Sequence, residues 1–437
     1  MSGLGRQQAV AVSAGAALAT ADCGLPLVPP TGRAQRLPPS VPPQGAESLF
    51  VPRPFDTSGP VAVITRYEDV LAALLNLDGI WGRGVPEDVI AAEDRHCTLE
   101  AAWSTDEPLH KRLRGSLARI NKGATPQARA FTRELTGRLL AAVMAERPPW
   151  DLTRVIYEVS MRLVIEQTLQ APLLLPHLRR LRELIREHVT APGGYFGIRR
   201  QPEAEEILGT VIDRRDELPE GGLARHLVDL HMAPEQPRRR RVRESAGQAG
   251  DGPEQFPLAR AQVIGQLWLL AVSSETQATA TASLLGMLLE FGEYAWARNA
   301  LGRPAAAELL IAEGYRLGIA FPASLLRATR PFTLDGQTIP AGTPCLASSA
   351  AANRDPAAFG DPQRFDPRAQ RDRPHLAFGF GGRRCSGATG AEQFTEDVLT
   401  ALVRGLPERV TLEQGTVCRE TGISMSVSCL PVTSGPP

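Results

Sequence analysis

The residues best suited to chemistry lie in a glycine-rich stretch at 378–387, which reads FGFGGRRCSG. It places Cys385 just before a helix-like run at 388–402. A thiolate can act as a nucleophile or a metal ligand, and it is favoured where backbone N–H groups and a helix N-terminus put positive potential beside the sulfur. Gly379 permits positive φ and the close approach of a flat group, and Arg383 adds a fixed charge. The stretch predicts a reactive thiol or a metal ligand, although an isolated cysteine is most often an inert core residue.

The spacing of this stretch forms a motif, whose fixed letters are Phe378, Gly379, Gly381, Arg383, Cys385 and Gly387. The motif resembles the heme-binding loop of the cytochrome P-450 family, in which the cysteine thiolate is the axial ligand of the heme iron and favours O–O cleavage. The resemblance implies heme b (iron protoporphyrin IX) as cofactor and Cys385 as its iron ligand. It also implies heme contacts from Phe378, Gly379, Arg383 and Gly387.

Candidates for binding the heme propionates lie in two other segments. Pro108 can start a helix, and His110 and Arg114 are then four residues apart on one face, where they could clasp an anion. Alone, such a pair is more typical of a solvated basic face. In the resembling family an H-x-x-x-R in this region binds the propionates, which implies that role here. Arg327 is the candidate for a further contact, although Leu326 stands where the family spacing places an arginine.

The longest proline-free apolar run, residues 258–294, contains a polar island. A buried carboxylate is costly unless it is paired or wetted, so Glu275 is either functional or on the solvent side of a helix. The run resembles the distal helix of the family, which implies that Glu275 and Thr276 deliver protons to iron-bound oxygen. Val272 and Ser273 stand where the family prefers a small residue and then glycine. They are candidate substrate contacts, and Ser273 could open the helix by bonding to the i−4 carbonyl.

A structural triad is implied by two further landmarks of the family. Pro304 can start a helix in which Glu313 and Arg316 are three residues apart, a spacing that suits an ion pair but is common in helices. The later run at 351–367 resembles the family's meander, whose arginine joins the E-x-x-R pair. Carried over, the triad is Glu313, Arg316 and Arg364, and its expected role is to hold the cysteine loop in place.

The elements that would position these residues are mostly helices. Apolar stripes alternate with charged faces over residues 67–75, 128–144, 151–169, 174–189 and 203–215. Short β-like runs occur at 61–65, at 332–342 and at 422–431, and the second of these predicts a hairpin turning at Asp335-Gly336. The pattern predicts a mainly α protein with small β-sheets. The resemblance implies the cytochrome P-450 fold, a triangular helical prism.

Length and composition allow one large catalytic domain. The chain has 437 residues, 43% hydrophobic, and Lys+Arg and Asp+Glu both total 48, so no global field recruits nucleic acid or an anionic membrane. The absence of CxxC spacing among the six cysteines suits a reducing compartment. We expect a Pro/Gly-rich extended arm over 1–55 and a catalytic domain over 56–437, with a flexible basic loop at 234–255. We also expect no membrane anchor and a cytoplasmic location.

The landmarks occur in the family's order along residues 60–432, which indicates a heme-thiolate monooxygenase that hydroxylates or epoxidises a small or carrier-bound substrate, as in bacterial secondary metabolism. Electrons would come from a separate ferredoxin or flavodoxin and its NAD(P)H-dependent reductase, since no flavin, Rossmann or iron–sulfur motif is fused to the chain. A basic cluster lies around the thiolate side, and some of it could face an acidic partner, whereas Arg383 is expected to face the heme: Arg371, Arg373, Arg383 and Arg384. Two alternatives remain: a heme-thiolate enzyme with peroxide-driven, coupling or dehydrating chemistry, and a non-catalytic heme-binding protein.

Overall fold

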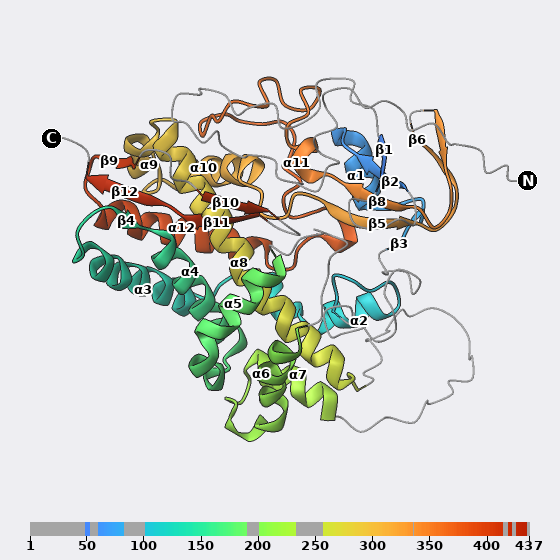
Figure 1. The fold of residues 1–437 in the computed structure, drawn as a ribbon, viewed down its shortest axis with the longest axis horizontal. Helices are drawn as coiled ribbons and strands as arrows, with labels where there is room; N and C mark the ends of the chain where they lie inside the picture. Colours follow the sequence, from blue (N-terminus) through green and yellow to red (C-terminus); the bar gives the residue numbers. More distant parts are fainter. Residues whose placement is uncertain are drawn as a thin grey trace, which may run out of the picture.

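Helices form most of the structure, and small sheets lie beside them (Figure 1). The computed structural model describes residues 49–52, 60–82, 101–189, 201–232, 257–334, 336–413, 418–421 and 425–434. The predicted fold class, mainly α with small β-sheets, is confirmed. Most of the predicted arm and the predicted basic loop at 234–255 lie outside the described residues.

The helices follow the predicted segments closely. In chain order they are α1 (Tyr67–Leu75), α2 (Leu109–Ser116), α3 (Pro126–Met144), α4 (Thr153–Arg162), α5 (Leu178–Val189), α6 (Pro202–Asp213), α7 (Leu223–Met232), α8 (Arg260–Glu290), α9 (Tyr294–Ala300), α10 (Pro304–Leu317), α11 (Ser349–Ala352) and α12 (Ala388–Gly405). Proline at the first position starts α3, α6 and α10, where its missing N–H costs no hydrogen bond. Thr125 also caps α3 by accepting a hydrogen bond from the Ala128 N–H.

The strands are short and assemble into several sheets. They are β1 (Leu49–Pro52), β2 (Pro60–Ile64), β3 (Trp81–Gly82), β4 (Trp150–Asp151), β5 (Ser324–Ala328), β6 (Phe332–Leu334), β7 (Gln337–Ile339), β8 (Pro344–Ala347), β9 (Val410–Leu412), β10 (Cys418–Thr421), β11 (Met425–Cys429) and β12 (Pro431–Ser434). The largest sheet has the order β1-β2-β8-β5-β3, in which only β2 and β8 are parallel. β4, β12 and β9 form a second sheet, and β6–β7 and β10–β11 are two-stranded. The predicted hairpin at 332–342 contains the paired strands β6 and β7, although Asp335 of its turn lies outside the described residues.

Helix α8 crosses the middle of the molecule and joins two hydrophobic cores (Figure 1). Its N-terminal half, including Leu267, Trp268 and Ala271, packs with residues of α5, α6 and α7. Its C-terminal half, including Leu285 and Leu288, packs with residues of α3, α4 and α12. A helix that is buried on nearly all sides must be apolar all round, which explains why its sequence shows no polar face. Any polar side chain along α8 must therefore find a partner or line a cavity.

Two sequence expectations change in the structure. Residues 49–52 fall inside the predicted extended arm, but they form β1, which pairs antiparallel with β2 through Leu49↔Val63 and Pro52↔Pro60. The predicted helix at 151–169 is not one regular helix, because α4 passes into a π-helical segment, Leu163–Leu169, that ends at Gln170 with φ of 54°.

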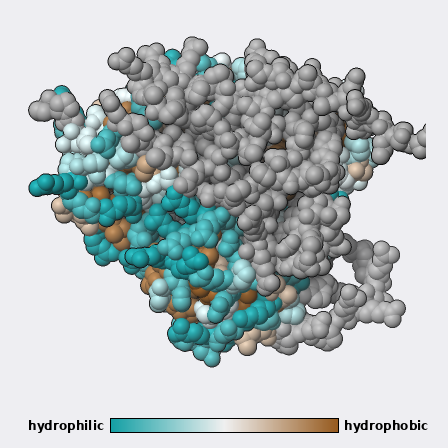
Figure 2. All heavy atoms as spheres, in the orientation of Figure 1, coloured by the Kyte–Doolittle hydropathy of each residue, from teal (hydrophilic) through white to brown (hydrophobic). Residues whose placement is uncertain are grey.

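The visible surface over α3 to α7 is mainly hydrophilic (Figure 2). On α5, Arg180 forms ion pairs with Glu183 of the same helix and with Glu203 of α6. Side chains of this kind cover the outer faces of helices whose other faces fill the core. No helix in the described part of the chain has the length and apolar character needed to cross a membrane.

Candidate active site

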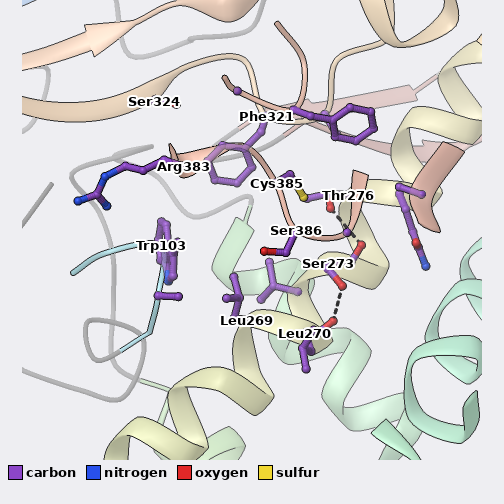
Figure 3. Close-up of a pocket in the computed structure, with 18 of the residues that line it drawn as sticks. Trp103, Leu269, Leu270, Ser273, Thr276, Phe321, Ser324, Arg383, Cys385 and Ser386 are labelled. Carbon is purple, nitrogen blue, oxygen red and sulfur yellow. Dashed lines mark hydrogen bonds between the residues drawn. The ribbon is translucent and has the colours of Figure 1, made fainter. Parts of the chain in front are cut away.

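A cavity of about 370 Å³ lies between α8 and the cysteine loop. Figure 3 shows Cys385 on one side of it, with Ser273 and Thr276 of α8 opposite and Trp103 and Phe321 at its edge. Most of the predicted site residues line this cavity: His110, Arg114, Val272, Ser273, Thr276, Phe378, Gly379, Arg383, Cys385 and Gly387. Residues far apart in sequence thus meet around one space.

The cysteine loop is held by its own backbone. The Cys385 N–H donates to the Phe378 carbonyl at 2.8 Å, which closes the loop just before α12 begins at Ala388. Gly379 and Gly381 both have φ of +65°, and a Cβ on Gly381 would lie 3.3 Å from the Leu75 Cα. These two positions therefore require glycine, the first for its conformation and the second also for the close approach to α1.

The sulfur of Cys385 is accessible from the cavity although protein atoms crowd it. Burial raises the pKa of Cys385, while the N–H groups of Gly387 and Ala388 and the charges of Arg384 and Arg114 act in the opposite direction. Without a cation to bind, the thiol is therefore the favoured form. A metal ion would favour the thiolate, because coordination replaces the proton.

An aromatic cluster packs behind the cysteine loop. Tyr315 of α10 lies 4.6 Å from Phe378 and 6.0 Å from His375, measured between ring centroids. Its hydroxyl donates to the Ala391 carbonyl of α12 at 3.0 Å. Burial, with Arg384 and Arg316, lowers the pKa of His375 to about 4. Tyr315 could not be selected from the sequence, since an aromatic residue in an amphipathic helix usually indicates only core packing.

The predicted cationic residues meet at one end of the cavity. His110 is buried, its Nδ1 donates to the Ala102 carbonyl at 2.7 Å, and its Nε2 is buried without a hydrogen-bond partner among the described residues. Burial lowers the pKa of His110, and the nearby charges of Arg383 and Arg114 lower it further. Arg383 donates to the Thr105 carbonyl and pairs with Asp106, both at 2.9 Å.

Arg327 does not line the cavity. Arg327 lies on β5 opposite Gly82 of β3, and its Nη2 would be 3.6 Å from a Cβ at Gly82. It is not among the residues that line the cavity, whereas Ser324 and Leu325 of the same strand are. Leu326 is buried in the core beneath the largest sheet. A Cβ at Gly82 would also be 3.1 Å from Asp106 Oδ2, and Asp106 pairs with Arg383. Arg327 therefore lies near the cationic residues without lining the cavity, and its heme contact stays a prediction.

The polar island of α8 divides between two environments. Thr276 and Ser273 line the cavity, and each hydroxyl donates to a carbonyl three residues earlier: Thr276 Oγ1 to Ser273 at 3.0 Å and Ser273 Oγ to Leu270 at 2.6 Å (Figure 3). α8 is continuous through this region, so the predicted opening of the helix at Ser273 is not present.

Glu275 does not line the cavity. It is buried, with 4% of its surface exposed, and its carboxylate accepts a hydrogen bond from Ser426 Oγ of β11 at 2.7 Å. Tyr157 of α4 lies in the same network, with its hydroxyl 2.9 Å from Thr279 Oγ1 and 3.4 Å from Ser426 Oγ. Burial, together with the Glu275 charge, raises the pKa of Tyr157 above its usual range. The predicted acid and alcohol therefore point to different partners.

The E-x-x-R pair forms a buried network beneath the cysteine loop. Arg316 Nε and Nη2 donate to the two Glu313 oxygens at 2.7 and 2.8 Å. Burial alone would raise the pKa of Glu313, but Arg316, the Asp366 N–H and Arg371 outweigh it, so this pKa is lowered.

The choice of Arg364 as third member of the triad was wrong. Its side chain is exposed, and it contributes only its backbone carbonyl, which accepts from Arg316 Nη2 at 3.0 Å. The guanidinium that reaches Glu313 belongs to Arg371, at 3.0 Å. The physical reason is burial: Arg371 is partly buried beside Glu313, whereas Arg364 keeps its charge in water.

Of the basic residues expected to face a partner, most are engaged elsewhere. Arg371 pairs with Glu313, Arg383 with Asp106, and Arg373 with Glu68. Arg384 is exposed, and it has no side-chain partner among the described residues. Of the four predicted residues, Arg384 and Arg373 are exposed, and Arg384 is the exposed one without a side-chain partner among the described residues.

The cavity fits a heme group on the chemistry of its donors. A single sulfur faces the space, the buried Nε2 of His110 lacks a partner, and two arginines and this histidine gather at one end. A planar macrocycle with an iron centre and two carboxylates needs these features: one axial ligand, room beside glycine, and cations for the carboxylates. Cys385 would hold the iron, and His110, Arg114 and Arg383 would hold the carboxylates. These features define a heme-thiolate site.

Comparison with known proteins agrees with this class of site. The cytochrome P-450 family model matches residues 307–407. Nocardicin C N-oxygenase from Nocardia uniformis subsp. tsuyamanensis is 30% identical over 375 residues, which cover 82% of this chain and 87% of that protein. Mycinamicin IV hydroxylase/epoxidase from Micromonospora griseorubida is 29% identical and covers 79% of this chain and 82% of that protein.

Solved structures show the same fold. A variant of the mixed-function P-450 MycG in complex with mycinamicin IV superimposes with a TM-score of 0.67 at 25% identity, covering 89% of this chain and 94% of that one. HinD with NMFT and NO gives a TM-score of 0.70 at 24% identity, covering 89% and 93%. The chain belongs to the cytochrome P-450 family, and it is an oxidoreductase that incorporates oxygen. The family implies a heme iron cofactor.

Proposed function

We propose that the protein is a heme-thiolate monooxygenase that uses heme b and inserts one oxygen atom into a small organic substrate of bacterial secondary metabolism. The observation that carries this proposal is the meeting of Cys385, the cations of the propionate end and Thr276 around one cavity. The names of the relatives, a hydroxylase/epoxidase and an N-oxygenase, support oxygen insertion. When bound, the heme supplies one-electron chemistry and activation of O₂.

The side chains around the cavity have separate tasks in this proposal. Cys385 would hold the heme iron through its thiolate, and the glycines beside it would leave room for the macrocycle. Arg114 would neutralise the propionates together with Arg383, which also pairs with Asp106. A propionate beside Nε2 of His110 would favour the protonated ring, because it supplies the missing partner and an opposite charge. The aromatic and aliphatic wall excludes water, which strengthens these electrostatic contacts.

Proton delivery is proposed for Thr276 and Glu275. The Thr276 hydroxyl lies in the cavity wall, while Glu275 is the buried carboxylate next to it in sequence. Its bond to Ser426 holds the carboxylate away from the cavity, so delivery requires a change of side-chain rotamer or an intervening water. We propose a ferredoxin or flavodoxin with its reductase as electron source, and Arg384 as a contact for this acidic partner.

The first test is the absorption spectrum of the reduced, CO-bound protein. A thiolate ligand should shift the Soret band to the long wavelength typical of this family, and Cys385→Ser should abolish that band. Tyr315→Phe is the matched control, because it removes one hydroxyl behind the loop without touching the sulfur. A wild-type band at the position of histidine-ligated hemoproteins would contradict the proposal.

A second candidate, peroxide-driven oxidation or oxidative coupling, is favoured by one observation. Ser273 occupies the wall opposite Cys385, and α8 stays continuous there, without the local opening of the helix at Ser273. Turnover measured with NADPH, reductase and ferredoxin, and separately with hydrogen peroxide, distinguishes the two. The monooxygenase proposal requires product formation coupled to NADPH consumption.

A further inference from the structure

The wall that α8 contributes to the cavity presents oxygen lone pairs rather than hydroxyl hydrogens. Ser273 Oγ lies 2.6 Å from the Leu270 carbonyl, and Thr276 Oγ1 lies 3.0 Å from the Ser273 carbonyl. A carbonyl oxygen can only accept, so each hydroxyl must donate its single hydrogen to the helix. Both oxygens are then left to the cavity as acceptors. A ligand that lies against this wall can therefore donate hydrogen bonds to these two oxygens.

Gln277 extends the same wall and is held in a fixed orientation. Its Nε2 donates to Ser160 Oγ of α4 at 2.7 Å, and Ser160 Oγ donates to the Ser274 carbonyl at 2.6 Å. Because the Ser160 hydrogen is used on that carbonyl, Ser160 can only accept from the amide, which places the nitrogen of Gln277 toward α4. The amide oxygen has no donor among the described residues, and Gln277 lines the cavity.

The rest of the lining is mainly apolar, although Ser104, His188 and Ser324 also belong to it, and its described residues carry no negative charge. Trp103, Leu269, Val272, Ala280 and Phe321 line it, and no Asp or Glu is among the described lining residues. A cationic ligand would therefore lose its hydration without meeting a counter-charge. The positive charges of Arg114 and Arg383 lie in the lining, but the proposed function uses them for the heme carboxylates.

We propose that this cavity takes a neutral, mainly apolar molecule with a hydroxyl or amide N–H group, which donates to Gln277 Oε1 and Ser273 Oγ. The proposal rests on the proposed function, because it assigns Arg114 and Arg383 to the heme. It makes Gln277 a specificity-determining residue, with Ser160 as the residue that positions it. An anchored amide loses little side-chain freedom when a ligand binds, which favours its use as a recognition group.

A matched ligand pair tests the proposal on the heme-loaded protein. 2-Naphthol carries a donor, whereas 2-methoxynaphthalene has the same rings and only an acceptor, and the shift of the Soret band reports the dissociation constant of each. One hydrogen bond should make 2-naphthol bind about three- to tenfold more tightly. Gln277→Leu should reduce this ratio to below about twofold, and Ser160→Ala should reduce it in part. Leu269→Ala, in the same wall, should weaken both ligands and leave the ratio unchanged.

Several outcomes would overturn the proposal. In the wild type, 2-methoxynaphthalene could bind as tightly as 2-naphthol or more tightly. Gln277→Leu could leave the ratio of the two dissociation constants unchanged, or 2-naphthoate could bind more tightly than 2-naphthol. The CO spectrum of each variant is recorded first. A spectrum without the thiolate band would contradict the proposed function, whereas an intact band with a ratio of one would contradict only this assignment of the wall.

Discussion

Glu275 and Thr276 are adjacent in sequence but belong to different parts of the molecule. Thr276 lies in the cavity wall, whereas the Glu275 carboxylate accepts from Ser426 Oγ at 2.7 Å in a network with Tyr157. The bond to Ser426 turns the Glu275 side chain toward β11, whereas Thr276 faces the cavity. The acid is therefore stabilised by β11 and α4, and its readiness for catalysis depends on those elements.

Ser426→Ala should weaken the fold through Glu275. The substitution removes the hydroxyl that donates to a buried carboxylate, and such bonds are worth roughly 1.5–3 kcal/mol. We expect the free energy of unfolding in urea to fall by about that amount. In the Glu275→Gln background the same substitution should cost only about 1 kcal/mol, because the remaining bond is between neutral groups. Equal costs in both backgrounds would show that Ser426 does not act through the charge.

At the residue scale, the sequence predicted the cavity residues that belong to a motif. It did not predict residues whose role depends on how side chains pack. Cys385, His110 and Arg114 carry motif spacing, and all three line the cavity. Arg364 and Arg371 stand in the same arginine-rich segment, and spacing alone did not show which one turns inward. Gln277 was missed because its role depends on Ser160, more than one hundred residues away, as their sequence separation of 117 shows.

At the scale of elements, the E-x-x-R helix α10 and the segment before the cysteine loop are joined by a buried charge network. Arg316 donates to the carbonyls of Pro362 and Arg364 at 2.7 and 3.0 Å and pairs with Glu313. Helix positions were predictable from apolar periodicity, because α1, α3 and α12 follow strong stripes. The pairing of 49–52 with β2 was not, since strand pairing depends on a partner rather than on local pattern.

Arg371→Ala and Arg364→Ala should have different effects although the two residues lie in one segment. The Arg371 substitution removes one of the two cations that pair with the Glu313 carboxylate, and breaking a buried pair costs up to about 3–5 kcal/mol. Because Arg316 stays and Arg371 is partly exposed, we expect about 1–3 kcal/mol in urea unfolding, with part of the heme lost on gel filtration. Arg364→Ala should change stability by less than about 0.5 kcal/mol, since its side chain is exposed. An equal loss of unfolding free energy in the two variants would show that the Arg364 side chain also belongs to the Glu313 network.

At the scale of the whole molecule, α8 contributes to both hydrophobic cores and also lines the cavity, with the cysteine loop on the other side. Stability and cofactor binding therefore depend on the same elements. His375 lies where they meet. It stacks on Tyr315, its Nδ1 accepts from the Ala377 N–H at 3.3 Å, and its pKa is lowered to about 4 by burial and by Arg384 and Arg316. The folded state therefore holds this ring neutral.

The neutral state of His375 should make the folded protein sensitive to acid. The unfolded chain titrates near pH 6.5 and the folded one near 4, so between these values the unfolded state binds more protons and stability falls as pH falls. From pH 7 to pH 5 this one ring should cost about 1–2 kcal/mol of the free energy of unfolding. His375→Asn removes the titration, so its urea-unfolding curves should shift less between the two pH values.

Glu313 also makes stability fall as pH falls, but mainly below pH 4.5, because its pKa in the folded protein is lowered from the ordinary value of 4.5. His226, whose pKa burial also lowers, provides the matched control: His226→Asn should leave the contribution of His375 in place. An unchanged pH difference in His375→Asn would show that the ring is already protonated in the folded protein or that it stays neutral in both states.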